Sequence, residues 1–180
     1  MPAVYGCRVA PTDRRPVALR TEQYYRKLAE DALAAVGCTE PPVPISDIVA
    51  SLYIPVRAVN LPAFFTAATI YEDGLPVMIV NHARPEIERR RALAHMTGHV
   101  LMALADNEDS YPRAEGDHHE ADLVARDLMM PTTMVLDQAR AWFNDYRYLS
   151  RLFGVTEGTM LERMRELGLV RNQAGTVWDF

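Results

Sequence analysis

The chain has 180 residues, of which 49% are hydrophobic and 24% charged, and a formal net charge of −5 at pH 7. This length is typical of one domain that buries a core without needing a disulfide or a structural metal. The composition is that of a globular protein and excludes a disordered chain, a collagen or a coiled coil. Proteins that coat nucleic acid are normally basic, so the negative charge disfavours that class.

Cysteine content and hydropathy predict a cytoplasmic protein. The two cysteines, Cys7 and Cys38, lack a CxxC spacing and are interpreted as free thiols of a reducing compartment. No apolar run reaches the ~18 residues that a membrane-spanning helix needs, so no membrane partner is expected. The N-terminal residues include arginines but no continuous apolar stretch, which predicts no secretory signal.

The chain is expected to form one domain with two appendages. Residues 1–20 are rich in arginine and proline and are expected to be an extended arm. A single domain is predicted over residues 21–170, with residues 133–170 as its C-terminal helical part. Residues 171–180 are expected to be a tail.

Two helices are expected at the start of this domain. Apolar residues recur at helical spacing over 22–36, and Thr21 and Gly37 flank this segment as N-cap and C-terminal stop. A short helix is expected to open at Ser46 and Asp47 and to run through Leu52.

Three short segments rich in β-branched and aromatic residues are expected to form strands, at 54–59, 65–71 and 77–80. The Asp-Gly pair at 73–74 is a hairpin signal between the second and the third. Pro76 lacks a backbone N–H, so it predicts an edge position or a bulge at the start of the third strand. Together the segments predict a small three-stranded sheet.

Helical spacing returns after residue 85 and continues almost to the end of the chain. Pro85 and the glutamates after it favour a helix start at that point. The acid-rich segment 106–116 is expected to be a loop, and Gly154 is expected to break the last segment into two helices. The expected helices span 86–104, 118–129, 133–144, 146–153 and 157–167.

His95 and His99 are the first candidate metal ligands. They stand four residues apart in the helix expected over 86–104, so they lie on one face, one turn apart. Both imidazoles can then reach a single divalent cation at ~2.0–2.1 Å. The same spacing also arises by chance, but the preceding hairpin and a further group of possible ligands at 117–122 favour a metal site.

Met96 follows the first of these histidines, at the position where zinc peptidases of the HExxH type carry a glutamate. That glutamate takes a proton from the attacking water and passes it to the leaving amine. A thioether is only a weak hydrogen-bond acceptor and has no usable acid form at neutral pH. The spacing therefore indicates a metal, whereas Met96 indicates that the usual general base is missing.

The segment 117–122, Asp-His-His-Glu-Ala-Asp, offers the third ligand. Asp117 and Glu120 have the D-x-x-E spacing of a capping box, so helix capping is an alternative role for both. His118 and Asp122 lie one helical turn apart, and a carboxylate beside a histidine is the arrangement that orients a metal ligand. Glu120 and His118 are thus candidate ligands, and Asp122 is a candidate supporting residue.

Several segments, in order along the chain, carry a resemblance to a known family. They are Ile79-Val80-Asn81, the run R-A-L-A-H-M-T-G-H at 91–99, Glu120-Ala121-Asp122, the run L-M-M-P at 128–131, and the C-terminal stretch 149–169. With them the chain resembles the ImmA/IrrE family of zinc metallopeptidases, small bacterial and phage proteins, several of which cleave repressors or regulators. The resemblance covers about residues 22–170.

This resemblance implies an α+β, zincin-like domain with a small three-stranded sheet, a pair of metal-site helices and a C-terminal helix-turn-helix-like region. It implies zinc bound by His95, His99 and a third ligand, and a protein or peptide partner, such as a transcriptional regulator. The family's third-ligand segment reads E-x-E-A, whereas this chain has His-His-Glu-Ala at 118–121. We favour Glu120 as the ligand and keep His118 as the alternative.

Met96 replaces the catalytic glutamate of the family, which predicts an impaired or inactive peptidase that binds rather than cuts. One alternative is a surrogate base, either a histidine or one of the acidic-loop residues Glu108, Asp109 and Glu115. Another is that Met96 was introduced into an otherwise active sequence.

Two rival functions come from other classes. The two helices at 146–153 and 157–167 resemble a helix-turn-helix, which suggests a DNA-binding regulator. Residues 140–171 contain six arginines and four acids, a local charge of only about +2, whereas phosphate neutralisation usually takes a denser basic face. The second rival is a metal-free protein-binding module.

Overall fold

The computed structural model describes residues 20–73, 75–105 and 118–170. Most of the expected arm, the acidic loop and the C-terminal tail lie outside the described residues. The elements are α1 (Glu22–Ala35), α2 (Ile45–Ser51), β1 (Val56–Val59), β2 (Ala67–Glu72), β3 (Leu75–Asn81), α3 (Glu86–Ala105), α4 (His118–Met129), α5 (Thr132–Ala141), α6 (Tyr146–Phe153) and α7 (Glu157–Glu166). The expected α+β fold class is confirmed.

Two element boundaries differ from expectation for local reasons. The helix expected over 133–144 ends at Ala141, because Phe143 and Asn144 adopt positive φ angles of 52° and 58°. The first strand starts two residues late, because the Ile54 N–H still donates to the Val49 carbonyl at the end of α2.

The second strand starts at Ala67 rather than at residue 65, because Asn81 holds the preceding loop. The buried Asn81 amide donates to the carbonyls of Leu61, Pro62 and Phe65, and its oxygen accepts from the Leu61 N–H. These bonds satisfy a buried polar side chain and keep the loop out of the strand ladder.

The sheet has the strand order β1-β3-β2. Strands β2 and β3 form the expected antiparallel hairpin, closed by Glu72 and Leu75, whereas β1 runs parallel to β3. The edge position suggested by Pro76 is wrong for the strand as a whole, because β3 is central. However, β1 pairs only with Met78–Asn81, so Pro76 lies where β3 has one neighbouring strand and a missing N–H is tolerated.

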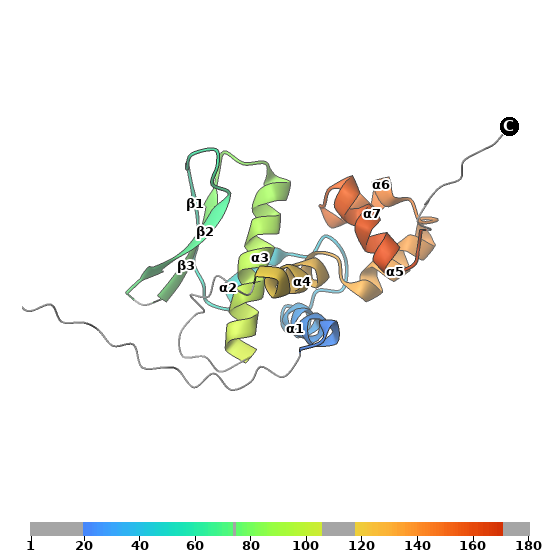
Figure 1. Ribbon diagram of the computed structural model, residues 1–180, viewed down its shortest axis with the longest axis horizontal. Helices are drawn as coiled ribbons and strands as arrows, with labels where there is room; N and C mark the ends of the chain where they lie inside the picture. The colour runs from blue at the N-terminus through green and yellow to red at the C-terminus, as the bar shows by residue number, and fades with distance from the viewer. Residues whose placement is uncertain (1–19, 74, 106–117, 171–180) are drawn as a thin grey trace, which may run out of the picture.

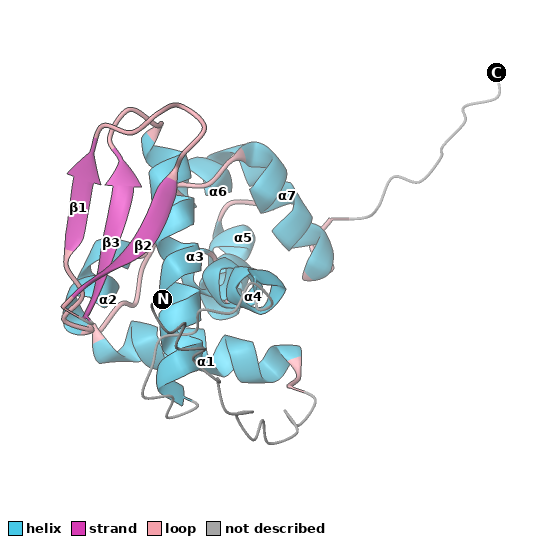
Figure 2. Ribbon diagram, turned by 60° about the vertical axis from the view of Figure 1, so that its left-hand side comes forward, coloured by secondary structure: helices cyan, strands magenta, loops and turns pink. Residues whose placement is uncertain are grey.

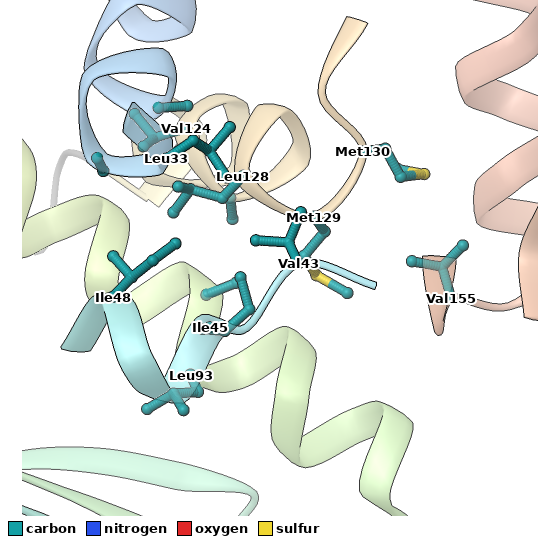
Figure 3. Packing of buried hydrophobic residues seen from close by; sticks show 14 of the residues in the cluster. Leu33, Val43, Ile45, Ile48, Leu93, Val124, Leu128, Met129, Met130 and Val155 are labelled. Carbon is teal, nitrogen blue, oxygen red and sulfur yellow. The ribbon is translucent and has the colours of Figure 1, made fainter. Parts of the chain in front are cut away.

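Helix α3 lies between the sheet and helices α4 to α7 (Figures 1 and 2). The sheet contacts one side of α3, and α4 crosses it on the other side, with α1 packed against α4. Leu33 of α1, Ile48 of α2 and Leu128 of α4 meet in the buried core (Figure 3). This arrangement fixes the relative position of α3 and α4. No helix among the described residues combines the length and apolar character that crossing a membrane requires.

A buried ion pair joins α4 to the C-terminal helices. Asp127 of α4 and Arg163 of α7 are each 2% exposed and bind each other directly. The Arg163 guanidinium also donates to the Met130 carbonyl and to Thr132 Oγ1, at 3.3 and 2.9 Å. Helix α4 is thus held from its C-terminal end as well as along its length.

The break between α6 and α7 is confirmed. Gly154 caps α6 with a φ of 64°, a left-handed conformation that glycine adopts without strain. Thr156 then caps α7 by accepting the Thr159 N–H at 3.1 Å. The cysteine Cys38 is a free thiol, and Cys7 lies outside the described residues.

Candidate metal centre

Helices α3 and α4 approach each other unusually closely at Gly98. A Cβ placed on Gly98 would lie 2.6 Å from the backbone oxygen of Ala121, well inside van der Waals contact. Gly98 lies between the two histidines of α3, and Ala121 lies one turn after His118 of α4. The absence of a side chain at Gly98 therefore lets imidazoles from two helices meet.

Three imidazoles converge at this crossing, and we call His95, His99 and His118 the histidine triad. His95 Nε2 lies 3.2 Å from His99 Nε2 and 3.1 Å from His118 Nδ1. The third side of the triangle, between His99 Nε2 and His118 Nδ1, is 3.2 Å. Within the described ranges, this is the one group of three or more histidine, cysteine, aspartate or glutamate side chains close enough to share a metal ion.

The triangle fits a metal better than it fits hydrogen bonding. A ring nitrogen carries either a proton or a lone pair, so three mutually adjacent nitrogens cannot all hydrogen-bond to one another. Two nitrogen ligands of a tetrahedral zinc, each at ~2.0–2.1 Å, stand about 3.3–3.4 Å apart. The 3.1–3.2 Å separations of the triad are close to this value. Three neutral nitrogen donors that leave a fourth position open also form a common zinc ligand set.

Asp122 supports the triad from α4. Its Oδ1 lies 2.9 Å from His95 Nδ1, the ring nitrogen that does not face the other histidines. A proton on Nδ1 satisfies this bond and leaves the lone pair of Nε2 directed at the centre of the triangle. The Asp122 side chain is 56% exposed, so solvent weakens the interaction without changing the orientation it favours.

Glu120 lies on a different side of α4 from His118. Two residues of an α-helix correspond to a rotation of about 200°, so the two side chains leave the helix in nearly opposite directions. Glu120 does not belong to the group that could share a metal, and its Oε2 is buried without a hydrogen-bond partner in the described part of the chain. The structure thus brings His118 and Asp122 to His95 and His99, and it does not bring Glu120 there. Asp117 lies outside the described residues.

Met96 is directed into the protein. It is 8% exposed and belongs to the hydrophobic core, about 100° around α3 from His95. The position after the first histidine therefore holds an apolar thioether, which cannot exchange a proton with anything bound at the triad.

The triad is accessible from solvent. His118 is exposed, the side chain of His95 is 24% exposed, and His99 is partly buried. The cavity of about 410 Å³ between α1 and the start of α5 is lined by other residues, among them Arg26 and Thr133, and does not include the histidines. A ligand can therefore reach the triad from solvent at His118 and His95.

Gly98 is the functional position that sequence reasoning overlooked. It was part of the histidine motif, but no packing role followed from its identity alone. The sequence did contain one indication of this role. A glycine in the interior of a helix lowers helix stability, and it often has a packing reason such as the close approach of another backbone.

Comparison with curated proteins gives no match. Among solved structures, the chain is similar to a Mycobacterium tuberculosis transcriptional regulator, with a TM-score of 0.60 and 19% identity over 85% of this chain. The chain spans about half (49%) of that protein's length, and at this identity the likeness shows the fold alone. The family model Peptidase_M78, the IrrE N-terminal-like domain, matches residues 50–165, a range that includes the whole histidine triad. The chain therefore belongs to the Peptidase_M78 family.

Proposed function

We propose that this domain binds zinc through the histidine triad and that it recognises a protein or peptide without cleaving it by the usual mechanism of zinc peptidases. The observation that carries the proposal is the triangle of three ring nitrogens, 3.1–3.2 Å apart, that closes at the crossing of α3 and α4. In this proposal His118 is the third ligand, and Glu120 is not.

The chain's own residues hold and orient this centre. Asp122 accepts a hydrogen bond from His95 Nδ1–H and so leaves the lone pair of Nε2 for the metal. Gly98 keeps α3 and α4 close enough for His118 to complete the set. A bound zinc ion would supply a Lewis acid that polarises a carbonyl group.

The missing step is proton transfer. A general base has to lie within about 3 Å of the proton that it takes, directly or through one water. Met96 offers no such group, and Asp122, the carboxylate in contact with the triad, is engaged with His95 Nδ1 on the outer side of the ring. The acidic surrogate bases considered above, Glu108, Asp109 and Glu115, lie outside the described residues. Loss of a positioned base typically lowers a rate by ~10²–10⁴.

A regulatory role in a bacterium or phage is part of the proposal. The family resemblance supports it, and so does the fold that the domain shares with a protein named as a transcriptional regulator. The expected partner is a protein or peptide, such as another regulator, in the cytoplasm. The exposed ring of His118 makes the triad accessible to a macromolecular partner.

Metal content per chain tests the proposal. The freshly purified protein, and the same protein reconstituted with zinc, should hold about one zinc per chain. His95→Ala, His99→Ala and His118→Ala should each lose it. Glu120→Ala and the matched control His119→Ala should keep it. Retention by His118→Ala together with loss by Glu120→Ala would assign the third ligand to Glu120, and absence of metal from the wild-type protein would refute the zinc site.

The DNA-binding alternative has less support. Of the six arginines in residues 140–171, Arg163 is buried in its ion pair with Asp127 and cannot reach a phosphate. Arg147 lies 3.9 Å from the carboxylate of Glu157, so its charge is partly compensated within the protein. Salt-dependent binding to duplex DNA that is lost on replacing Arg151 and Arg165 would revive this alternative.

A further inference from the structure

We propose that the metal-loaded histidine triad accepts a carboxylate group from a partner as its additional ligand. This inference rests on the proposed function and names the chemical group that the site would recognise. It follows from four properties of the triad: the charge of its donors, its neighbours, its accessibility and the nature of Met96.

The first property is charge. His95, His99 and His118 are neutral when they bind a metal, so the whole +2 charge of a zinc ion would stay uncompensated by its protein ligands. A donor set with one glutamate would remove one unit of that charge. A three-histidine centre therefore attracts an anion more strongly than a centre with two histidines and a carboxylate.

The second property is that no described carboxylate of the chain competes for the open position of the triad. Asp122 is the acidic neighbour of the triad, and its Oδ1 is engaged with His95 Nδ1 at 2.9 Å, on the outer side of the ring. In the part of the chain that the structure describes, no carboxylate is near enough to all three ring nitrogens to join the group. No described carboxylate of the chain therefore occupies the open position of the triad.

The third property is access to the triad from solvent. The exposed ring of His118 and the partly exposed ring of His95 place the centre at the surface, within reach of a side chain or a chain terminus.

The fourth property is the apolar character of the buried Met96, which carries no charge that would repel an incoming carboxylate. A glutamate at residue 96 would introduce such repulsion beside His95. Within this proposal, Met96 therefore favours binding of a carboxylate at the same position where it removes a catalytic base.

Cobalt substitution tests this inference with a readout that does not depend on activity. The Co²⁺-loaded protein is titrated with acetate while its visible absorption is followed, since Co²⁺ spectra respond to a change in the metal's ligands. A saturable spectral change is expected. Peptides that carry a free C-terminus, or an internal glutamate with an amidated C-terminus, then show which source of carboxylate binds more tightly.

Variants of matched charge separate ligation from general electrostatics. His118→Glu should still hold Co²⁺ but should bind acetate at least about tenfold more weakly, because the charge of the centre falls by one unit. His119→Glu adds the same charge on a neighbouring residue outside the triad and should have a much smaller effect. Met96→Glu should weaken acetate binding, whereas the neutral Met96→Gln should not. Thermal unfolding followed by circular dichroism verifies that each variant is folded.

The possible failures are distinguishable. If the wild-type protein does not bind Co²⁺ or Zn²⁺, the proposed function is wrong and the inference falls with it. If the metal binds but the spectrum does not respond to acetate or to either peptide, only the inference is overturned. Equal acetate affinities of His118→Glu and His119→Glu would also overturn it, because the donor charge of the triad would then have no role.

Discussion

Gly98 of α3 lies directly over the backbone carbonyl of Ala121 of α4, with room for a hydrogen atom but not for a methyl group. This contact sets the spacing between the helix that carries His95 and His99 and the helix that carries His118. The geometry of the histidine triad therefore depends on a residue that is not one of its ligands.

Gly98→Ala should destabilise the protein and weaken its affinity for zinc. An alanine in a helix interior normally stabilises by about 1 kcal/mol over glycine. Here the new Cβ would lie 2.6 Å from a backbone oxygen, and overpacking of this kind costs ~1–3 kcal/mol. Urea unfolding and zinc competition with a chelator measure both effects. Gly158→Ala in α7 is the control, because its Cβ would meet only Thr156 Oγ1 at 3.9 Å. Equal stability of the two variants would contradict the packing role of Gly98.

Asp122→Ala should lower zinc affinity by about 10–100-fold, because the partner that orients a ligating imidazole is removed. Asp122→Asn should lose less zinc affinity, because its amide oxygen can still accept a hydrogen bond from His95 Nδ1–H. The measurement is a competition titration against a chromogenic chelator. Zinc affinities that do not differ between Asp122→Ala and the wild-type protein would show that the 2.9 Å contact has no role in metal binding.

Met96→Glu should create or strongly raise peptidase activity, because it places a carboxylate next to His95, where proton transfer is missing. The assay is cleavage of unstructured protein and mixed peptides, with and without a chelator. Met96→Gln is the control, since it has a similar size and no acid–base function. A Met96→Glu variant that holds zinc but cleaves nothing would remove most of the support for a peptidase-like groove.

Asp127→Ala should destabilise the fold by up to ~3–5 kcal/mol, because it removes the fully buried partner of the Arg163 guanidinium and leaves it with the partly exposed carboxylate of Glu166 at 3.2 Å. Asp31→Ala is the matched control, since its pair with Lys27 lies at the surface, with side chains 60% and 66% exposed. That change should cost much less stability, because solvent screens a pair of exposed charges. Urea unfolding followed by circular dichroism compares the two, and a similar loss in both would show that the buried pair contributes nothing special.

The sequence by itself determined the order of the elements and most of their boundaries. Helical periodicity, the Asp-Gly hairpin signal and Gly154 report local preferences, and local preferences decide where a helix or a turn begins and ends. The spacing of His95 and His99 likewise required a shared helix face, because residues four apart in a helix always lie one turn apart.

Tertiary packing decided what local patterns left open. The parallel pairing of β1 with β3, which makes the strand of Pro76 central, depends on contacts between segments distant in the chain. The side of α4 that faces α3 is set by Ala121 against Gly98 and by the buried pair of Asp127 with Arg163. This orientation brings His118 to the other two histidines and turns Glu120 away. No pattern within residues 117–122 contains that information, because the rotation of a helix about its axis is fixed by what it packs against.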